Sequence, residues 1–135
     1  MDSSYYIYDH VTSYAFRVAD KKGNYIGGVI LPGLRVSLNS LSGKTAQLPY
    51  ISLEVPNKVI GKNTIDCMRA GIVFSNVDMI DGILDRMEKE LGETPTVIAT
   101  GGLARFITPL CRHEIIFDDA LLLKGLLILY RKNTQ

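Results

Sequence analysis

Residues 5–31 read YYIYDHVTSYAFRVADKKGNYIGGVIL, and this stretch decides the fold. It contains three short runs rich in aromatic and β-branched residues, at 5–8, 14–18 and 25–31. The middle run alternates apolar with small or polar residues at a period of two, as a half-buried strand does. Gly23 and Asn24 tolerate a positive φ, so they favour a tight hairpin between the second and third runs. We therefore expect the chain to begin with a three-stranded antiparallel meander.

Helical patterns dominate the rest of the chain. A short amphipathic pattern covers 34–41, and a longer one covers 64–91 until Gly92 ends it. Residues 96–99 form a continuous apolar strand, whereas 121–130 are apolar on nearly every side of a helix. Such a helix needs cover on both sides, from the sheet and from another helix or a partner subunit. These patterns alone predict one layered α/β domain.

Length, charge and cysteine content narrow the class of protein. The chain has 135 residues, with 15 basic and 14 acidic side chains. This length favours a single domain, and the absence of a charged block argues against nucleic acid as a partner. No apolar run approaches the length of a membrane span. Cys67 and Cys111 lack metal-ligand or disulfide spacing, so we expect buried or half-buried thiols in a cytoplasmic protein that does not bind membranes.

Six short motifs occur in one order between Gly27 and Leu126. They are Gly27-Gly28, Pro32-Gly33-Leu34, Lys44-Thr45-Ala46-Gln47-Leu48-Pro49, Ile60-Gly61-Lys62-Asn63-Thr64, Thr100-Gly101-Gly102-Leu103-Ala104 and Leu123-Lys124-Gly125-Leu126. The span from the first motif to the last covers about three quarters of the chain. The series resembles the C-terminal lobe of type III pantothenate kinases, two-lobed actin-like enzymes that phosphorylate pantothenate at the first committed step of coenzyme A synthesis.

This resemblance implies an α/β fold and a definite domain. Residues 1–135 would form a single ribonuclease-H-like lobe of the actin-like ATPase superfamily, equivalent to the family's C-terminal lobe. Its antiparallel meander would be followed by helices and a further parallel strand. The family's N-terminal lobe carries an Asp-x-Gly-Asn-Thr phosphate loop and a Gly-x-Asp-Arg segment whose Asp is the general base. Neither segment occurs here, so we expect the chain alone to be inactive.

The resemblance also assigns a role to the first hairpin. The family has Asp-x-Gly-Thr there, whose Asp binds an activating monovalent cation, K⁺ or NH₄⁺, and whose Thr contacts ATP. Asp9 and Thr12 match this motif, but Val11 replaces its glycine. A β-branched side chain restricts the backbone and blocks its close approach to phosphate. Either the hairpin still binds nucleotide, or Asp9 is a turn acid and Thr12 a strand residue.

Two further sites follow from the resemblance. Thr64 occupies the position of a threonine that contacts pantothenate, although a threonine there can also simply cap the helix. Thr100, Gly101 and Gly102 resemble the adenosine-binding motif, with Mg²⁺ expected to accompany the ATP. Alternatively, these three residues form an ordinary strand-to-helix turn without a binding role.

Three functions remain open from the sequence, one of them a module that only binds pantothenate or a nucleotide. The first is a one-lobe subunit or fragment of a type III pantothenate kinase, which converts pantothenate to 4'-phosphopantothenate with ATP. A longer pantothenate kinase-like subunit or a second copy of the chain would be its partner. The second is a degenerate, non-catalytic member that regulates or scaffolds a partner, as Val11 and the missing segments suggest. His10 and His113 lack metal-ligand spacing and are expected to be surface or hydrogen-bonded histidines.

Overall fold

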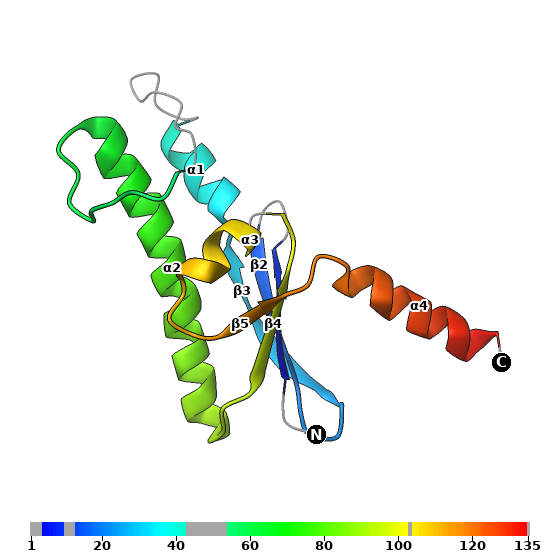
Figure 1. Ribbon diagram of the computed structural model, residues 1–135. Coiled ribbons are helices and arrows are strands. Elements are labelled where there is room, and N and C mark those ends of the chain that lie inside the picture. The colour runs from blue at the N-terminus through cyan, green and yellow to red at the C-terminus, as the bar shows by residue number, and fades with distance from the viewer. Residues whose placement is uncertain (1–3, 10–12, 43–53, 103, 135) are drawn as a thin grey trace.

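The computed structural model describes residues 4–9, 13–42, 54–102 and 104–134 (Figure 1). Among these residues the strands form one five-stranded sheet in the order β3-β2-β1-β4-β5. The elements in chain order are β1 (Ser4–Asp9), β2 (Ser13–Ala19), β3 (Tyr25–Pro32), α1 (Leu34–Ser42), α2 (Thr64–Leu91), β4 (Thr96–Thr100), α3 (Ala104–Ile107), a 3₁₀ turn (Thr108–Leu110), β5 (Ile115–Phe117) and α4 (Leu121–Asn133).

The sheet confirms the predicted meander and extends it. Strand β1 pairs antiparallel with β2, and β2 pairs antiparallel with β3. Strand β4 runs parallel to β1, with Tyr8 opposite Thr100, as expected for the further parallel strand. Strand β5, which the sequence patterns do not predict, adds parallel to β4 with Phe117 opposite Ala99. The carboxyl ends of β1, β4 and β5 therefore lie at one edge of the sheet.

Helix α2 is the longest element and covers one face of the sheet. Asn63 caps it by accepting a hydrogen bond from the backbone N–H of Asp66, and Gly92 ends it in the left-handed conformation. These ends confirm the bounds that the apolar periodicity predicts. The core between the sheet and the helices contains fully buried side chains: Tyr5, Ile7, Phe16, Leu34, Val73, Ile80 and Leu84.

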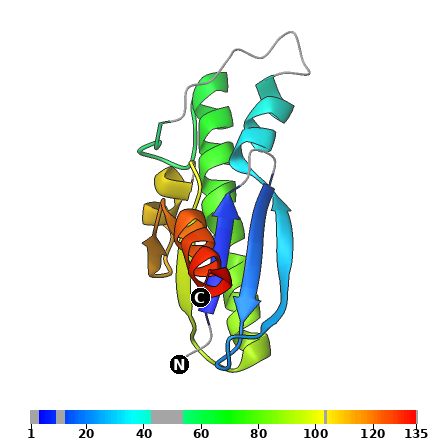
Figure 2. The same cartoon turned by 90° about the vertical axis from the view of Figure 1, so that its right-hand side faces the viewer.

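Helix α4 lies on the opposite side of the sheet from α2 and projects away from the body (Figures 1 and 2). It has no buried residue, and each apolar side chain from Leu122 to Tyr130 is 46–68% exposed. The expectation that the sheet covers one side of this helix is therefore not met within the chain. An apolar hollow of about 450 Å³ separates α4 from the sheet residues Tyr6 and Arg17.

Two other expectations concern the cysteines and membranes. Cys111 is half-buried as expected, whereas Cys67, near the start of α2, is exposed although the neighbouring Met68 is buried in the core. Among the described residues, none of the helices combines the length and apolarity needed to cross a bilayer.

Candidate functional site

The carboxyl edge of the parallel strands brings together residues that are distant in sequence. Because Tyr8 pairs with Thr100, the backbone of Asp9 and that of Gly101 follow at the same edge of the sheet. Ligands of open α/β sheets bind outside the carboxyl ends of such strands. Thr12 and the side chain of Asp9 lie outside the described part of the structure. The fold thus places the end of the first hairpin strand beside the Thr100-Gly101-Gly102 turn.

The turn after β4 opens onto a hollow of about 380 Å³. Thr100 is 5% exposed, and Gly101 has a φ of 111°, a conformation that favours glycine. Across the hollow stand Arg105 and the first turn of α4. The complete lining is Thr100, Gly101, Gly102, Arg105, Phe117, Asp119, Leu122 and Leu123.

Arg105 supplies the positive charge of this hollow. Its guanidinium lies 3.1 Å from Asp119 and 5.1 Å from the centre of the Phe117 ring. Both contacts hold the cation beside the glycine turn, where its exposed face remains accessible to an anionic ligand. The hollow therefore combines a glycine-containing turn, the Arg105–Asp119 ion pair and an apolar wall.

Asp118 stabilises the start of α4 through hydrogen bonds. Its carboxylate accepts hydrogen bonds from Lys124 Nζ at 2.7 Å and from the backbone N–H of Ala120 at 3.0 Å. The hydrogen bond from Lys124 lowers the pKa of Asp118, so this carboxyl is ionised at neutral pH. The backbone N–H of Asp118 also donates to Ala99 at 2.8 Å. The Leu123–Leu126 motif thus anchors α4 to the end of β4.

Thr64 lies at a second location, the beginning of α2. It is exposed and is the first residue of the helix, whereas Asn63 performs the capping. Asn63 Oδ1 accepts from the N–H of Asp66 at 2.9 Å, and its side-chain amide donates to the Asp66 carboxylate at 2.9 Å. The structure therefore assigns the cap to Asn63, and the helix-cap interpretation of Thr64 is wrong.

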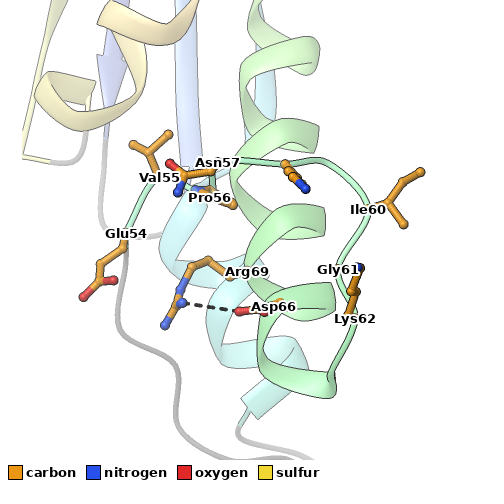
Figure 3. A pocket seen from close by; sticks show the side chains of 10 residues that line it. Glu54, Val55, Pro56, Asn57, Ile60, Gly61, Lys62, Asp66 and Arg69 are labelled. Carbon is orange, nitrogen blue, oxygen red and sulfur yellow. Dashed lines mark ion pairs between the residues drawn. The ribbon is translucent and has the colours of Figure 1, made fainter.

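A hollow of about 420 Å³ adjoins this helix start (Figure 3). Arg69 and Asp66, three residues apart on α2, both line it and form an ion pair, with Arg69 Nη1 3.9 Å from Asp66 Oδ1. A Cβ atom at Gly61 would overlap the backbone N of Cys67, so this loop packs directly on α2. The complete lining is Glu54, Val55, Pro56, Asn57, Lys58, Ile60, Gly61, Lys62, Asp66 and Arg69.

A third constellation, which sequence reasoning missed, joins α2 to the segment before β5. Asp81, 6% exposed, accepts hydrogen bonds from the backbone N–H groups of Arg112 at 2.8 Å and His113 at 3.1 Å. Burial opposes ionisation of Asp81, yet these hydrogen bonds hold its pKa below the usual value. The available signal was the spacing of Asp81, Asp85 and Glu88, which places three carboxylates on one face of the helix.

Comparison with known proteins agrees with the fold and the motifs. A family profile described as type III pantothenate kinase matches residues 3–86. A type III pantothenate kinase from Citrifermentans bemidjiense is 44% identical over 127 residues, which cover 94% of this chain and 50% of the relative. One from Syntrophus aciditrophicus is 38% identical over 128 residues, covering 95% of this chain and 50% of the relative.

A solved structure supports the same architecture. The crystal structure of a Baf family protein from Campylobacter jejuni matches with a TM-score of 0.64, covering 99% of this chain and 60% of that one. At 18% identity this likeness shows the fold alone. The chain spans about half the length of the curated relatives it matches. With a profile match over more than half of its residues, the chain belongs to the type III pantothenate kinase family.

Proposed function

We propose that the chain is one lobe of a type III pantothenate kinase, the counterpart of the family's C-terminal lobe over residues 1–135. In an assembled enzyme it would contribute to transfer of the ATP γ-phosphoryl group to pantothenate. One observation carries this proposal: the glycine turn at the carboxyl edge of β4 borders a hollow that is also lined by Arg105, which is paired with Asp119. That combination suits a nucleotide, because phosphates need close backbone approach and positive charge.

The proposal gives each candidate residue a role. Thr100, Gly101 and Gly102 would contact the adenosine part of ATP, which arrives with Mg²⁺. Thr12 would contact ATP from the first hairpin, and Asp9 would bind the monovalent cation. Because Asn63 already caps α2, the hydroxyl of Thr64 is left to interact with pantothenate.

Catalysis would require a second lobe. Phosphoryl transfer depends on positioned groups that orient the nucleophile and neutralise charge. The family's general base and first phosphate loop have no counterpart in this sequence. A longer pantothenate kinase-like chain, or a second copy assembled with other parts, would have to supply them. We expect the purified chain alone to show no pantothenate kinase activity.

The test is reconstitution with a longer pantothenate kinase-like chain that carries Asp-x-Gly-Asn-Thr and Gly-x-Asp-Arg. The mixture should form a stable complex and release ADP in a pantothenate-dependent manner above the rate of either chain alone. Arg105→Gln in the complex should raise the KM for ATP about tenfold, since a charge-assisted contact is lost. Arg86→Gln, which removes an exposed cation on α2, is the matched control. Unchanged ATP kinetics in Arg105→Gln, or no gain of activity on mixing, would refute the proposal.

A regulatory or scaffolding role is the second candidate. Its specific support is α4, whose apolar side chains from Leu122 to Tyr130 are exposed and suited to binding a partner. Val11 in place of the hairpin glycine also favours it. A stable complex in which the longer chain has the same or lower activity, with no effect of Arg105→Gln, would support this role over the catalytic one.

A further inference from the structure

The cluster around His113 contains an arrangement that the kinase proposal does not use. His113 precedes β5 and its side chain is 10% exposed, so it is nine-tenths buried against α2. One ring nitrogen, Nδ1, lies 2.7 Å from Asp81 Oδ1. The other, Nε2, lies 3.1 Å from Asp85 Oδ1 and 3.5 Å from Glu88 Oε1. A single imidazole is thus surrounded by three carboxylates of one helix.

The hydrogen bonds fix which nitrogen carries the proton. An ionised carboxylate only accepts hydrogen bonds, so Asp81 requires a proton on Nδ1. In a neutral ring Nε2 then presents its lone pair, here directed toward two further carboxylate oxygens. The lone pair of Nε2 and the carboxylate oxygens of Asp85 and Glu88 repel one another at these distances. A positive species between Nε2, Asp85 and Glu88 is therefore needed, either a proton on Nε2 or a metal ion.

The distances are compatible with both species, and the second carboxylate favours the metal. A proton on Nε2 makes one linear hydrogen bond and leaves the second carboxylate poorly compensated. A tetrahedral metal with ligands at about 2.0 Å separates neighbouring ligand atoms by about 3.3 Å. The observed 3.1 and 3.5 Å lie on either side of that value. All three ligand atoms lie within 4.8 Å of one another, so a small closure of the two carboxylates completes one face of a tetrahedron.

We propose that His113 Nε2, Asp85 and Glu88 bind a divalent transition metal of the zinc class. Imidazole combined with carboxylates suits zinc and its neighbours better than Ca²⁺ or Mg²⁺, which prefer oxygen ligands alone. The sequence spacing places the carboxylates on one face of α2 but gives no hint of His113, which meets them only in the folded chain. The site lies on α2 and the segment before β5, apart from the residues that line the nucleotide hollow.

The surroundings supply the outer contacts that metal sites require. Asp81 holds Nδ1 of the ligand histidine, the carboxylate–histidine–metal arrangement that fixes ring orientation. Arg112 contacts both oxygens of Asp85, with Nη2 2.6 Å from Oδ2 and Nη1 3.4 Å from Oδ1, so the metal would share Oδ1 with the longer of the two hydrogen bonds. Three carboxylates outnumber the one guanidinium. The positive charge of a metal would therefore be well compensated.

A fourth ligand has room to enter. A hollow of about 240 Å³ is lined by both Glu88 and His113, together with Thr94 and Glu114. Water in that hollow can complete a tetrahedral sphere, as in sites that use three protein ligands. The metal would tie the edge strand β5 to α2, since its ligands come from both sides of that junction. The inference therefore concerns a stabilising metal site and is independent of kinase activity.

The test uses the full chain after chelator treatment. Zn²⁺ is titrated against a chromophoric competitor, and Co²⁺ is added separately to obtain the absorption spectrum of a tetrahedral site. We expect one Zn²⁺ per chain, a tetrahedral Co²⁺ spectrum and a higher Tm with Zn²⁺. Glu88→Gln should weaken Zn²⁺ binding at least tenfold, and Asp81→Asn should weaken it about 10–100-fold.

Glu90→Gln is the matched control, because it removes an exposed carboxylate two residues further along α2. It should bind Zn²⁺ as the unmodified chain does. Circular dichroism of each variant establishes that it is folded before the titration. If the folded chain binds no Zn²⁺ at micromolar concentration, or if Glu88→Gln and Glu90→Gln bind it equally, the proposal is wrong.

Discussion

Replacing Gly61 by alanine should destabilise the fold measurably, although Gly61 lies in a loop before α2. A Cβ atom there would overlap the backbone N of Cys67 and lie 2.7 Å from the carbonyl carbon of Asp66. Both obstacles are main-chain atoms of the first helical turns, which cannot rotate away as a side chain would. Overpacking of this kind costs about 1–3 kcal/mol. We expect Gly61→Ala to lower the free energy of unfolding by that amount.

Gly71→Ala provides a control of opposite sign. Gly71 lies within α2, and a Cβ atom there meets nothing within 4 Å. Alanine in a helix interior is favoured over glycine by about 0.5–1 kcal/mol, so this variant should be more stable. Urea unfolding followed by circular dichroism measures both changes. Stability equal to the unmodified chain in Gly61→Ala, alongside a stabilised Gly71→Ala, would refute the close packing of loop on helix.

Three further outcomes are expected. Burial raises the pKa of Cys111 to about 12, so mass spectrometry after iodoacetamide treatment at mildly alkaline pH should find the exposed Cys67 modified first; equal rates would contradict this. Lys124→Gln removes the hydrogen bond that lowers the pKa of Asp118, so the variant should have a lower Tm than the unmodified chain at neutral pH, where Asp118 is ionised. The two Tm values should converge as the pH falls through the pKa of Asp118. A Tm difference that does not depend on pH would show that this hydrogen bond is not its cause. In a reconstituted enzyme, Thr64→Val should raise the pantothenate KM while Thr64→Ser retains it, and a lower Tm with unchanged KM would remove Thr64 from the substrate site.

Local patterns predicted the elements whose burial is one-sided and regular. The meander in residues 5–31 follows from alternation and from a turn that contains Gly23 and Asn24. The ends of α2 follow from a capping Asn63 and a left-handed Gly92, both of which satisfy exposed backbone groups. These signals depend on residues that are close in sequence, so they can be recognised from the sequence alone. The ribonuclease-H-like lobe itself was identified through resemblance rather than from periodicity.

Features made by contacts between distant segments escaped prediction. Strand β5 has three residues, too few to show a period, and it exists because it pairs with β4. The His113 cluster joins residues 25–32 positions apart, and Asp85, which the helical spacing pairs with Lys89, instead binds Arg112 at 2.6 Å. Cys67 was expected to be buried or half-buried, but it is exposed beside the buried Met68. In each case tertiary geometry decides the environment of the side chain.

The two proposed sites differ in how far they depend on what covers α4. The hollow beside Thr100 is walled by Leu122 and Leu123, which are 60% and 68% exposed and belong to a helix with no buried residue. Any partner that covers α4 would therefore reshape this hollow, and under the proposed function the affinity for nucleotide would be a property of the complex. The ligands around His113 come from α2 and the segment before β5, which pack within the chain itself. Metal binding should consequently be complete in the isolated chain, while nucleotide binding should strengthen when a partner covers α4.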